Sequence, residues 1–280
     1  MAQIRVVTDT ACDLPQDIID RFGLALVPLR IRFGQEEFVD RFELSTEDFW
    51  ARCSTFDELP STAAPSPGQF QVAFETIRDE GADGLVCVNL SSKLSATIEA
   101  ARQAARAFDG SFEVRIVDSL SVSLGQGLVV VEAAERAATG ASIDVVEAAA
   151  SKAVAGLKLF GAIDTLENLK RGGRIGNAQA LLGSLLSIKP VIEVRGGIVE
   201  QESKQRTRSR SLRYLAEKAL AAGPVSRMAV LSALAPDLDE LIAMLADVDS
   251  AQPLMISTVG PVIGTHAGPG AVGVTWIPAS

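Results

Sequence analysis

The sequence predicts an α/β protein built from two α/β domains, an N-terminal domain with a parallel sheet and a C-terminal domain with a mixed sheet. Short apolar, β-branched runs alternate with helical patterns along most of the chain, which is typical of largely parallel sheets. A Gly-Gly pair at 196–197 joins two strand-like runs and indicates a hairpin, so the second half is not purely parallel. The 280 residues, 48% of them hydrophobic, can bury a substantial core.

Eight apolar runs are the strand candidates, and in chain order they span 4–7, 24–33, 85–88, 114–117, 159–163, 228–231, 254–258 and 272–277. Apolar residues recur on one helical face at 100–108, in a helix expected to begin near Thr97, and likewise at 130–137 and 238–245. A further helix is expected at about 68–79. The alanine-rich stretch 129–155 predicts two packed helices broken at Thr139 and Gly140, and the hairpin pairs 188–194 with 198–201. We place the domain boundary so that the domains are 1–157 and 158–280.

Composition narrows the function classes. The net charge of −9 argues against a general nucleic-acid surface, so the basic run at 204–213 favours a solvated face or a protein-docking patch. Three cysteines without a C-x-x-C motif argue against a disulfide framework and a zinc site, and they favour a cytoplasmic location. The start of the chain has no basic-then-apolar signal peptide. Residues 250–280 carry no charged side chain, but prolines and glycines interrupt the run, which excludes a membrane span.

His266 is the only histidine in the chain, so any imidazole chemistry must use it. It lies in the glycine-rich segment 262–274, directly after the apolar run that ends at Val259. We expect this segment to be a loop beyond a strand, which would let the imidazole meet an anion.

Hydroxyl-rich segments follow or precede several other expected elements, at 8–15, 61–68, 91–97 and 118–121. Backbone N–H groups at a helix N-terminus favour an anion, but Ser, Thr and Asp are also ordinary N-caps. Ser92, Ser95 and Thr97 together are more hydroxyls than one cap needs, which favours a ligand site.

The segment 164–175 is expected to form a short helix. Asp164 with Glu167 resembles a capping box, and Gly172 fits a helix C-terminus. Lys170, Arg171 and Arg174 then gather at the negative end of the helix, where they serve either dipole compensation or the recognition of an anion or an acidic partner.

Motifs for common catalytic chemistry are weak or missing. The sequence has no P-loop and no G-x-S-x-G elbow, and the G-x-G-x-x-G match at 268–273 lacks a following helix and a nearby acidic residue. A site built on several histidines is excluded, whereas an all-carboxylate Mg²⁺ site from Asp9, Asp13 and Asp118 stays open. The alternative functions are a hydrolase or phosphatase using His266 or Asp9, and a regulatory module using the basic run.

Seven segments in the same order resemble the DegV family of bacterial fatty-acid-binding proteins, and the resemblance covers nearly the whole chain. The segments are TDTACDLP at 8–15, VPL at 27–29, STAAPSP at 61–67, SSKLSAT at 91–97, LENLKRGGRI at 166–175, IKP at 188–190 and IGTHAGPGAVG at 263–273.

The resemblance implies a two-domain α/β fold with one fatty acid between or beside the domains. It implies that Thr62, Ser92 or Ser95, and His266 hold the carboxylate, and that Arg171 and Arg174 lie near the head group or on a partner's surface. Ala96 replaces the glycine of the family's L-S-G-T, and Ala63 and Ala64 replace the S-Q after the binding threonine. These departures affect the loop backbone and the choice of acyl chain.

The resemblance also implies a non-catalytic role without a cofactor or a metal. Some members of the family are the lipid-presenting subunit of fatty acid kinase. The ATP-binding partner subunit, which resembles dihydroxyacetone kinases, phosphorylates the carboxylate, and the acyl phosphate feeds phospholipid synthesis. Such a role allows transient contact with a membrane.

Overall fold

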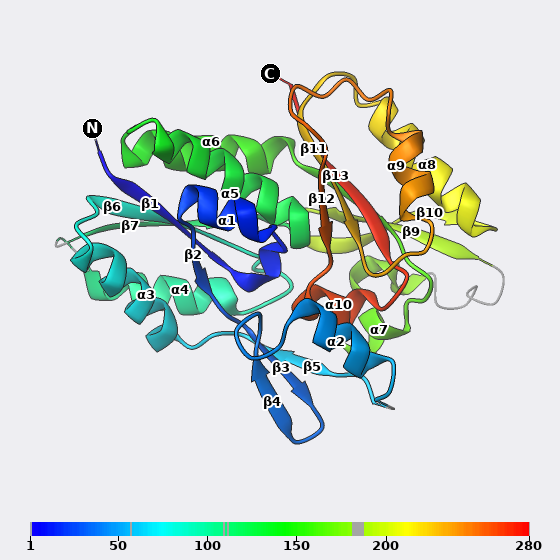
Figure 1. Ribbon diagram of the computed structural model, residues 1–280, viewed down its shortest axis with the longest axis horizontal. Coiled ribbons are helices and arrows are strands. Elements are labelled where there is room, and N and C mark those ends of the chain that lie inside the picture. The colour runs from blue at the N-terminus through cyan, green and yellow to red at the C-terminus, as the bar shows by residue number, and fades with distance from the viewer. Residues whose placement is uncertain (1, 57, 109, 111, 181–187, 280) are drawn as a thin grey trace.

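The computed structural model describes residues 2–279 apart from 57, 109, 111 and 181–187, and its described strands form three sheets. The first sheet is parallel throughout, in the order β2-β1-β6-β7 (Figure 1). Its strands are β1 (Ile4–Asp9), β2 (Ala25–Val27), β6 (Gly84–Asn89) and β7 (Glu113–Asp118). The parallel N-terminal sheet that the sequence predicts is therefore confirmed.

Helices cover both faces of this sheet, which explains why β6 is buried along its whole length. Val6, Val86 and Val88 point to one face, while Val7, Leu85 and Cys87 pack in a separate cluster on the other. The helices on the first face are α1 (Gln16–Phe22), α5 (Ser123–Ala138) and α6 (Ile143–Gly156), and those on the second are α3 (Pro67–Asp79) and α4 (Thr97–Ala105), which continues into η2 (Arg106–Phe108). The break between α5 and α6 falls where the sequence predicts it.

The second sheet is mixed, as expected, in the order β10-β9-β8-β13-β11-β12, and only β11 and β12 run parallel. Gly196 and Gly197 both have positive φ at the predicted hairpin turn. The strands are β8 (Lys158–Ala162), β9 (Lys189–Arg195), β10 (Ile198–Gln205), β11 (Val225–Ser232), β12 (Met255–Thr258) and β13 (Val272–Pro278), and α8 (Arg208–Leu220) and α9 (Leu238–Met244) pack on one face.

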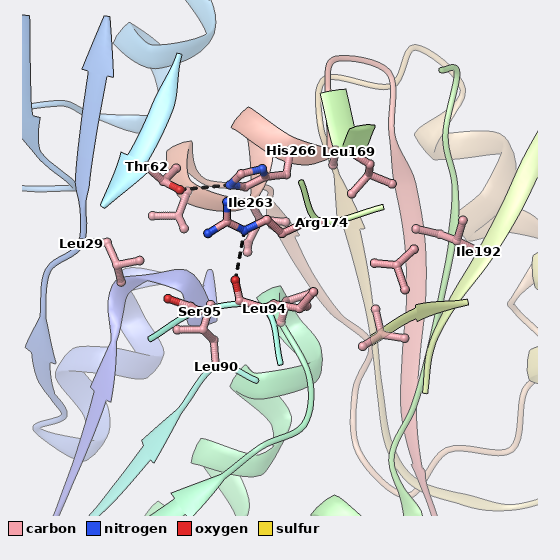
Figure 2. A pocket seen from close by; sticks show the side chains of 15 residues that line it. Leu29, Thr62, Leu90, Leu94, Ser95, Leu169, Arg174, Ile192, Ile263 and His266 are labelled. Carbon is pink, nitrogen blue, oxygen red and sulfur yellow. Dashed lines mark hydrogen bonds between the residues drawn. The ribbon is translucent and has the colours of Figure 1, made fainter. Parts of the chain in front are cut away.

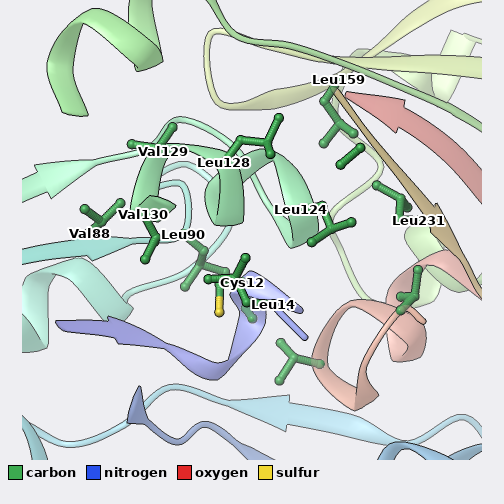
Figure 3. Close-up of a cluster of buried hydrophobic side chains, with 14 of the residues drawn as sticks. Cys12, Leu14, Val88, Leu90, Leu124, Leu128, Val129, Val130, Leu159 and Leu231 are labelled. Atoms are coloured by element: carbon green, nitrogen blue, oxygen red, sulfur yellow. The ribbon is translucent and has the colours of Figure 1, made fainter. Parts of the chain in front are cut away.

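Helix α5 packs between the two sheets, so one hydrophobic cluster runs across both halves of the chain (Figure 3). Leu124 and Leu128 of α5 lie in this cluster with Val88 of the first sheet and with Leu159 and Leu231 of the second. Helix α6 ends at Gly156 and β8 begins at Lys158, but the core is continuous past that point, so the division at residue 157 stays a prediction.

The run 24–33, predicted as one strand, is two strands in different sheets. Pro28 separates β2 from β3 (Arg30–Phe33), because proline has no amide hydrogen to continue a ladder. β3 pairs antiparallel with β4 (Glu36–Val39) and β5 (Ser61–Ala63) in a small sheet that projects from the body of the molecule (Figure 1). Helix α2 (Thr46–Cys53) lies between β4 and β5 in the chain, and no sequence pattern predicted it.

The glycine-rich segment that carries His266 is not a loop, and this expectation was wrong. Residues Pro261–Ala267 form helix α10, with proline in the first turn and Gly268 ending it at φ 76°. Gly264 lies against the rings of Phe49 and Trp50 of α2, where an added Cβ would come within 2.8 Å of either ring. The glycine therefore permits close packing of two helices rather than an open loop.

The predicted capping box at Asp164 and Glu167 is also wrong, because α7 (Glu167–Arg171) begins after Leu166. The amide of Glu167 donates to Thr165 Oγ1 at 3.1 Å, and Asp164 pairs with Lys189 at 2.9 Å. The three cysteines are free, as the sequence indicates. None of the helices in the described ranges is long and apolar enough to cross a membrane.

Candidate functional site

An apolar cavity lies between the first sheet's loops, the small sheet, α10 and the β9–β10 hairpin (Figure 2). Four of its lining residues are polar, namely Thr62, Ser95, Arg174 and His266. The other described lining residues are Leu29, Leu90, Leu94, Val122, Leu169, Ile192, Val194, Val199, Val262, Ile263 and Ala267. A cavity with apolar walls and a few polar groups is the usual form of a small-molecule site.

Thr62 and His266 are 204 positions apart in the chain and meet at the cavity wall, with Thr62 Oγ1 3.0 Å from His266 Nε2 (Figure 2). β5 places Thr62 opposite Ile31 in the small sheet, and His266 lies in the last turn of α10. The antiparallel pairing of a three-residue strand thus brings the hydroxyl to the imidazole.

Burial, with a smaller contribution from the charge of Arg174, lowers the pKa of His266 to about 4, so the imidazole is neutral at pH 7. Its Nδ1 is buried and has no hydrogen-bond partner among the described residues. A buried N–H left unpaired is costly, so we assign the proton to Nε2, which donates to Thr62 Oγ1. The hydroxyl hydrogen of Thr62 is then free to donate to a ligand in the cavity.

We expect His266 to stay neutral as the pH falls from 8 to 5, because its lowered pKa lies below that range. The lone histidine gives a single ¹³Cε1–¹H resonance, so a pH titration by NMR needs no assignment. The ¹⁵N shifts should identify the Nε2–H form. A titration midpoint between pH 6 and 7 would contradict the burial of this ring.

Gly172 lies directly beside the imidazole. An added Cβ at this position would be 2.3 Å from His266 Nδ1, although its φ of −72° suits any residue. Gly172→Ala should therefore displace the ring from Thr62 and shift the histidine resonance. Gly173→Ala is the matched control, because position 173 has φ +71° but open space around it. A resonance that moves equally in both variants would point to backbone strain instead.

Arg174 crosses from the end of α7 to the loop before α4. Its Nε donates to Leu94 O at 3.1 Å and its Nη1 to Gly172 O at 2.6 Å. Its Nη2 has no hydrogen bond to a described residue, and Arg174 is the only lysine or arginine among the described lining residues. The guanidinium is therefore held in place with one nitrogen free to meet an anion.

The two serines predicted for the site differ in position. Ser95 lines the cavity, and its Oγ lies 2.9 Å from Thr97 Oγ1 and accepts from the Thr97 amide, the first of α4, at 3.3 Å. Ser92 lies outside the lining, and its amide donates to Asp118 Oδ1 at 3.2 Å. Arg171 lies outside it too, in a surface groove on the other side of α10.

The structure thus brings together Thr62, Ser95, Arg174 and His266 but not Ser92 or Arg171. Their roles toward a ligand stay predictions. The sequence did not predict that β9 and β10 form walls of the cavity, or that Gly172 lies against the ring of His266. The one sequence signal for the latter was the Gly-Gly pair at 172–173.

Asp9 is a structural carboxyl rather than a reactive one. It is fully buried outside the cavity lining, and Ala11 N, Leu90 N and the amides of Asn89 and Gln126 all donate to it. The sequence left open a Mg²⁺ site from Asp9, Asp13 and Asp118, but no group of three or more His, Cys, Asp or Glu side chains comes together to hold a metal in the part of the chain that the structure describes.

Comparisons with known proteins agree with this architecture. A family model described as "Uncharacterised protein, DegV family" matches residues 3–279. A DegV domain-containing protein of Streptomyces coelicolor is 38% identical over 275 residues, covering 97% of each chain. A fatty-acid-binding DegV family protein from Thermus thermophilus has a similar structure, with a TM-score of 0.90, 30% identity and coverage of 99% of this chain and 100% of that one. DegV of Bacillus subtilis, described as a fatty acid binding protein, gives a TM-score of 0.85 at 28% identity and full coverage of both chains.

Proposed function

The chain belongs to the DegV family, and from that premise we propose that it binds one long-chain fatty acid in the apolar cavity and presents the carboxylate to a kinase partner. The observation that carries the proposal is the cavity itself, with apolar side chains along most of its walls and Thr62, Ser95 and Arg174 together in its lining.

The apolar walls favour an acyl tail. Burial of each CH₂ contributes about 0.8 kcal/mol, so a sixteen-carbon chain gains on the order of 10 kcal/mol before association costs. The empty space between the walls is about 650 Å³, and part of it opens to solvent. Strands β9 and β10 form one side of these walls.

The polar residues suit a carboxylate head. Burial of an unpaired carboxylate costs several kcal/mol, and the guanidinium of Arg174, whose Nη2 has no hydrogen bond to a described residue, supplies the compensating charge. Thr62 and Ser95 supply neutral hydroxyl donors, and His266 fixes the direction of the Thr62 hydroxyl. A head held by hydroxyls and one cation stays available for transfer of a phosphoryl group from ATP on the partner.

A hydrolase built on His266 finds little support in this geometry. Thr62 and His266 resemble a nucleophile and its base, but no described residue gives Nδ1 the acidic partner that orients a catalytic histidine. A pKa of about 4 also makes the imidazole a poor base at pH 7.

Native mass spectrometry of protein expressed in a bacterium tests the binding half of the proposal. We expect the added mass of one fatty acid, which is lost on delipidation and regained with palmitate. Thr62→Val, which keeps the shape of threonine without its hydroxyl, should retain less lipid than Thr62→Ser. A protein that acquires no lipid in either step contradicts binding.

Incubation of the loaded protein with ATP and a dihydroxyacetone-kinase-like subunit tests the presentation half. Hydroxylamine trapping should detect an acyl phosphate that depends on both proteins. If lipid binds but no acyl phosphate forms with the cognate kinase subunit, the chain is a fatty-acid carrier without the presentation role.

A further inference from the structure

Asp13 is a buried carboxyl that the cavity does not use directly. It follows η1 (Thr10–Cys12) in the left-handed conformation, with φ 50°. The amide of Gly260 donates to its Oδ1 at 3.0 Å, and the hydroxyl of Ser123 donates to its Oδ2 at 2.6 Å. The hydroxyl of Ser257 donates to its backbone carbonyl at 2.6 Å. One residue thus joins three segments that are far apart in the sequence.

Both partners of the carboxyl begin a helix that borders the cavity. Gly260 directly precedes α10, which supplies His266 and three other lining residues. Ser123 is the first residue of α5 and follows Val122, another lining residue. Ser123 also has a positive φ of 52°, which a residue with a side chain holds only when its surroundings enforce it.

The fit around the carboxyl is close. A Cβ added at Gly260 would lie 2.5 Å from Asp13 Oδ1, so the start of α10 can approach only because this residue is glycine. Burial raises the pKa of Asp13, the charge of Arg41 lowers it and that of Asp40 raises it. Apolar residues could fill such a site at lower cost, so a polar junction here favours a role in fixing geometry.

We propose that Asp13 is a positioning residue of the lipid site. Its carboxyl fixes the starts of α5 and α10 relative to each other, and through α10 it sets the place of His266 against Thr62. This inference rests on the proposed function, because the residues that it positions are those that would hold the fatty-acid head.

Two readouts separate positioning from general stability: the affinity for palmitate and the single histidine resonance. Ser123→Ala and Asp13→Ala should each weaken palmitate binding by about ten-fold or more and shift that resonance. Asp13→Asn keeps an acceptor for Gly260 and offers a donor to Ser123 Oγ, so it should recover most of the loss seen in Asp13→Ala. If Asp13→Ala does not fold, the two readouts of Ser123→Ala test the proposal on their own.

Thr275→Ala is the control, because Thr275 Oγ1 donates to Lys158 O at 2.8 Å at a buried position of the second sheet outside the cavity lining. It should lower the melting temperature without moving the resonance or the affinity. The inference is overturned if Ser123→Ala leaves both readouts at wild-type values, or if Thr275→Ala changes them as much. Failure of the delipidated wild type to bind palmitate would instead overturn the proposed function, and the resonance would still test the positioning.

Discussion

Arg174→Ala is expected to weaken palmitate binding by roughly 100-fold. Arg174 is the only lysine or arginine among the described lining residues, and the neutral imidazole of His266 cannot replace its charge. Removal of the cation from a buried carboxylate costs on the order of 3 kcal/mol of binding free energy. Each 1.4 kcal/mol is a factor of ten in affinity. Isothermal titration of delipidated protein with palmitate measures the change.

Hexadecanol separates the charge of Arg174 from its structural role, because this ligand has the same tail and a neutral head. The guanidinium also holds the carbonyls of Leu94 and Gly172, and alanine releases both. If only the charge matters, hexadecanol should bind the variant about as well as the wild type, and Arg174→Lys should recover part of the palmitate affinity. An equal loss for both ligands would show that Arg174 shapes the cavity rather than pairs with the head.

Local patterns predict the two main sheets because each strand there carries its own signal. The strands of the first sheet are apolar runs between helices with a clear apolar face, and the hairpin turn has two glycines with positive φ. The small sheet lacks such signals. β5 has three residues, of which two are exposed, and it forms only because β3 offers it an edge. The position of Thr62 therefore depends on a pairing that local sequence does not reveal.

Helix α10 shows a second limit of sequence reasoning. Its glycines indicate a loop when read alone, but Gly264 faces Phe49 and Trp50, more than 200 residues earlier. The indole Nε1 of Trp50 also donates to Val259 O at 3.0 Å, just before the helix. Tertiary packing thus outweighs the local preference of glycine.

The neighbouring hydroxyls of the 91–97 segment show the same limit on a smaller scale. Ser91 Oγ donates to Gly197 O at 2.7 Å, the Ser92 amide bonds to Asp118, and Ser95 alone of the three lines the cavity. The composition of this segment indicates a ligand site, but the path of its backbone decides which serine lines the cavity. The resemblance to a family supplies the motif without making that choice.

Asp13→Asn should raise the free energy of unfolding relative to the wild type, and this gain should grow as the pH rises. Burial raises the pKa of Asp13 from 3.8 to about 7, so between these values the unfolded chain ionises while the folded protein keeps its proton. Folding is then disfavoured progressively as the pH rises to 7, and the loss is constant above it. We expect the free energy of unfolding of Asp13→Asn, relative to the wild type, to be roughly 2–3 kcal/mol larger at pH 8 than at pH 5. Urea unfolding at the two pH values measures this change.

Asp40 provides the matched comparison, because it is also a buried carboxyl and its pKa is raised to about 6. Asp40→Asn should show the same sign with roughly half the change, because the folded Asp40 carboxyl ionises near pH 6, so its destabilising effect grows over about one pH unit above pH 5 instead of about two. His266 acts in the opposite direction in the wild type, because its lowered pKa costs stability as the pH falls from 6.5 toward 4. The difference between wild type and variant cancels that contribution. If the free energy of unfolding of Asp13→Asn differs from that of the wild type by the same amount at pH 5 and pH 8, then Asp13 is already ionised in the folded protein at pH 5. The two donors that fix α5 and α10 would then hold it in that form.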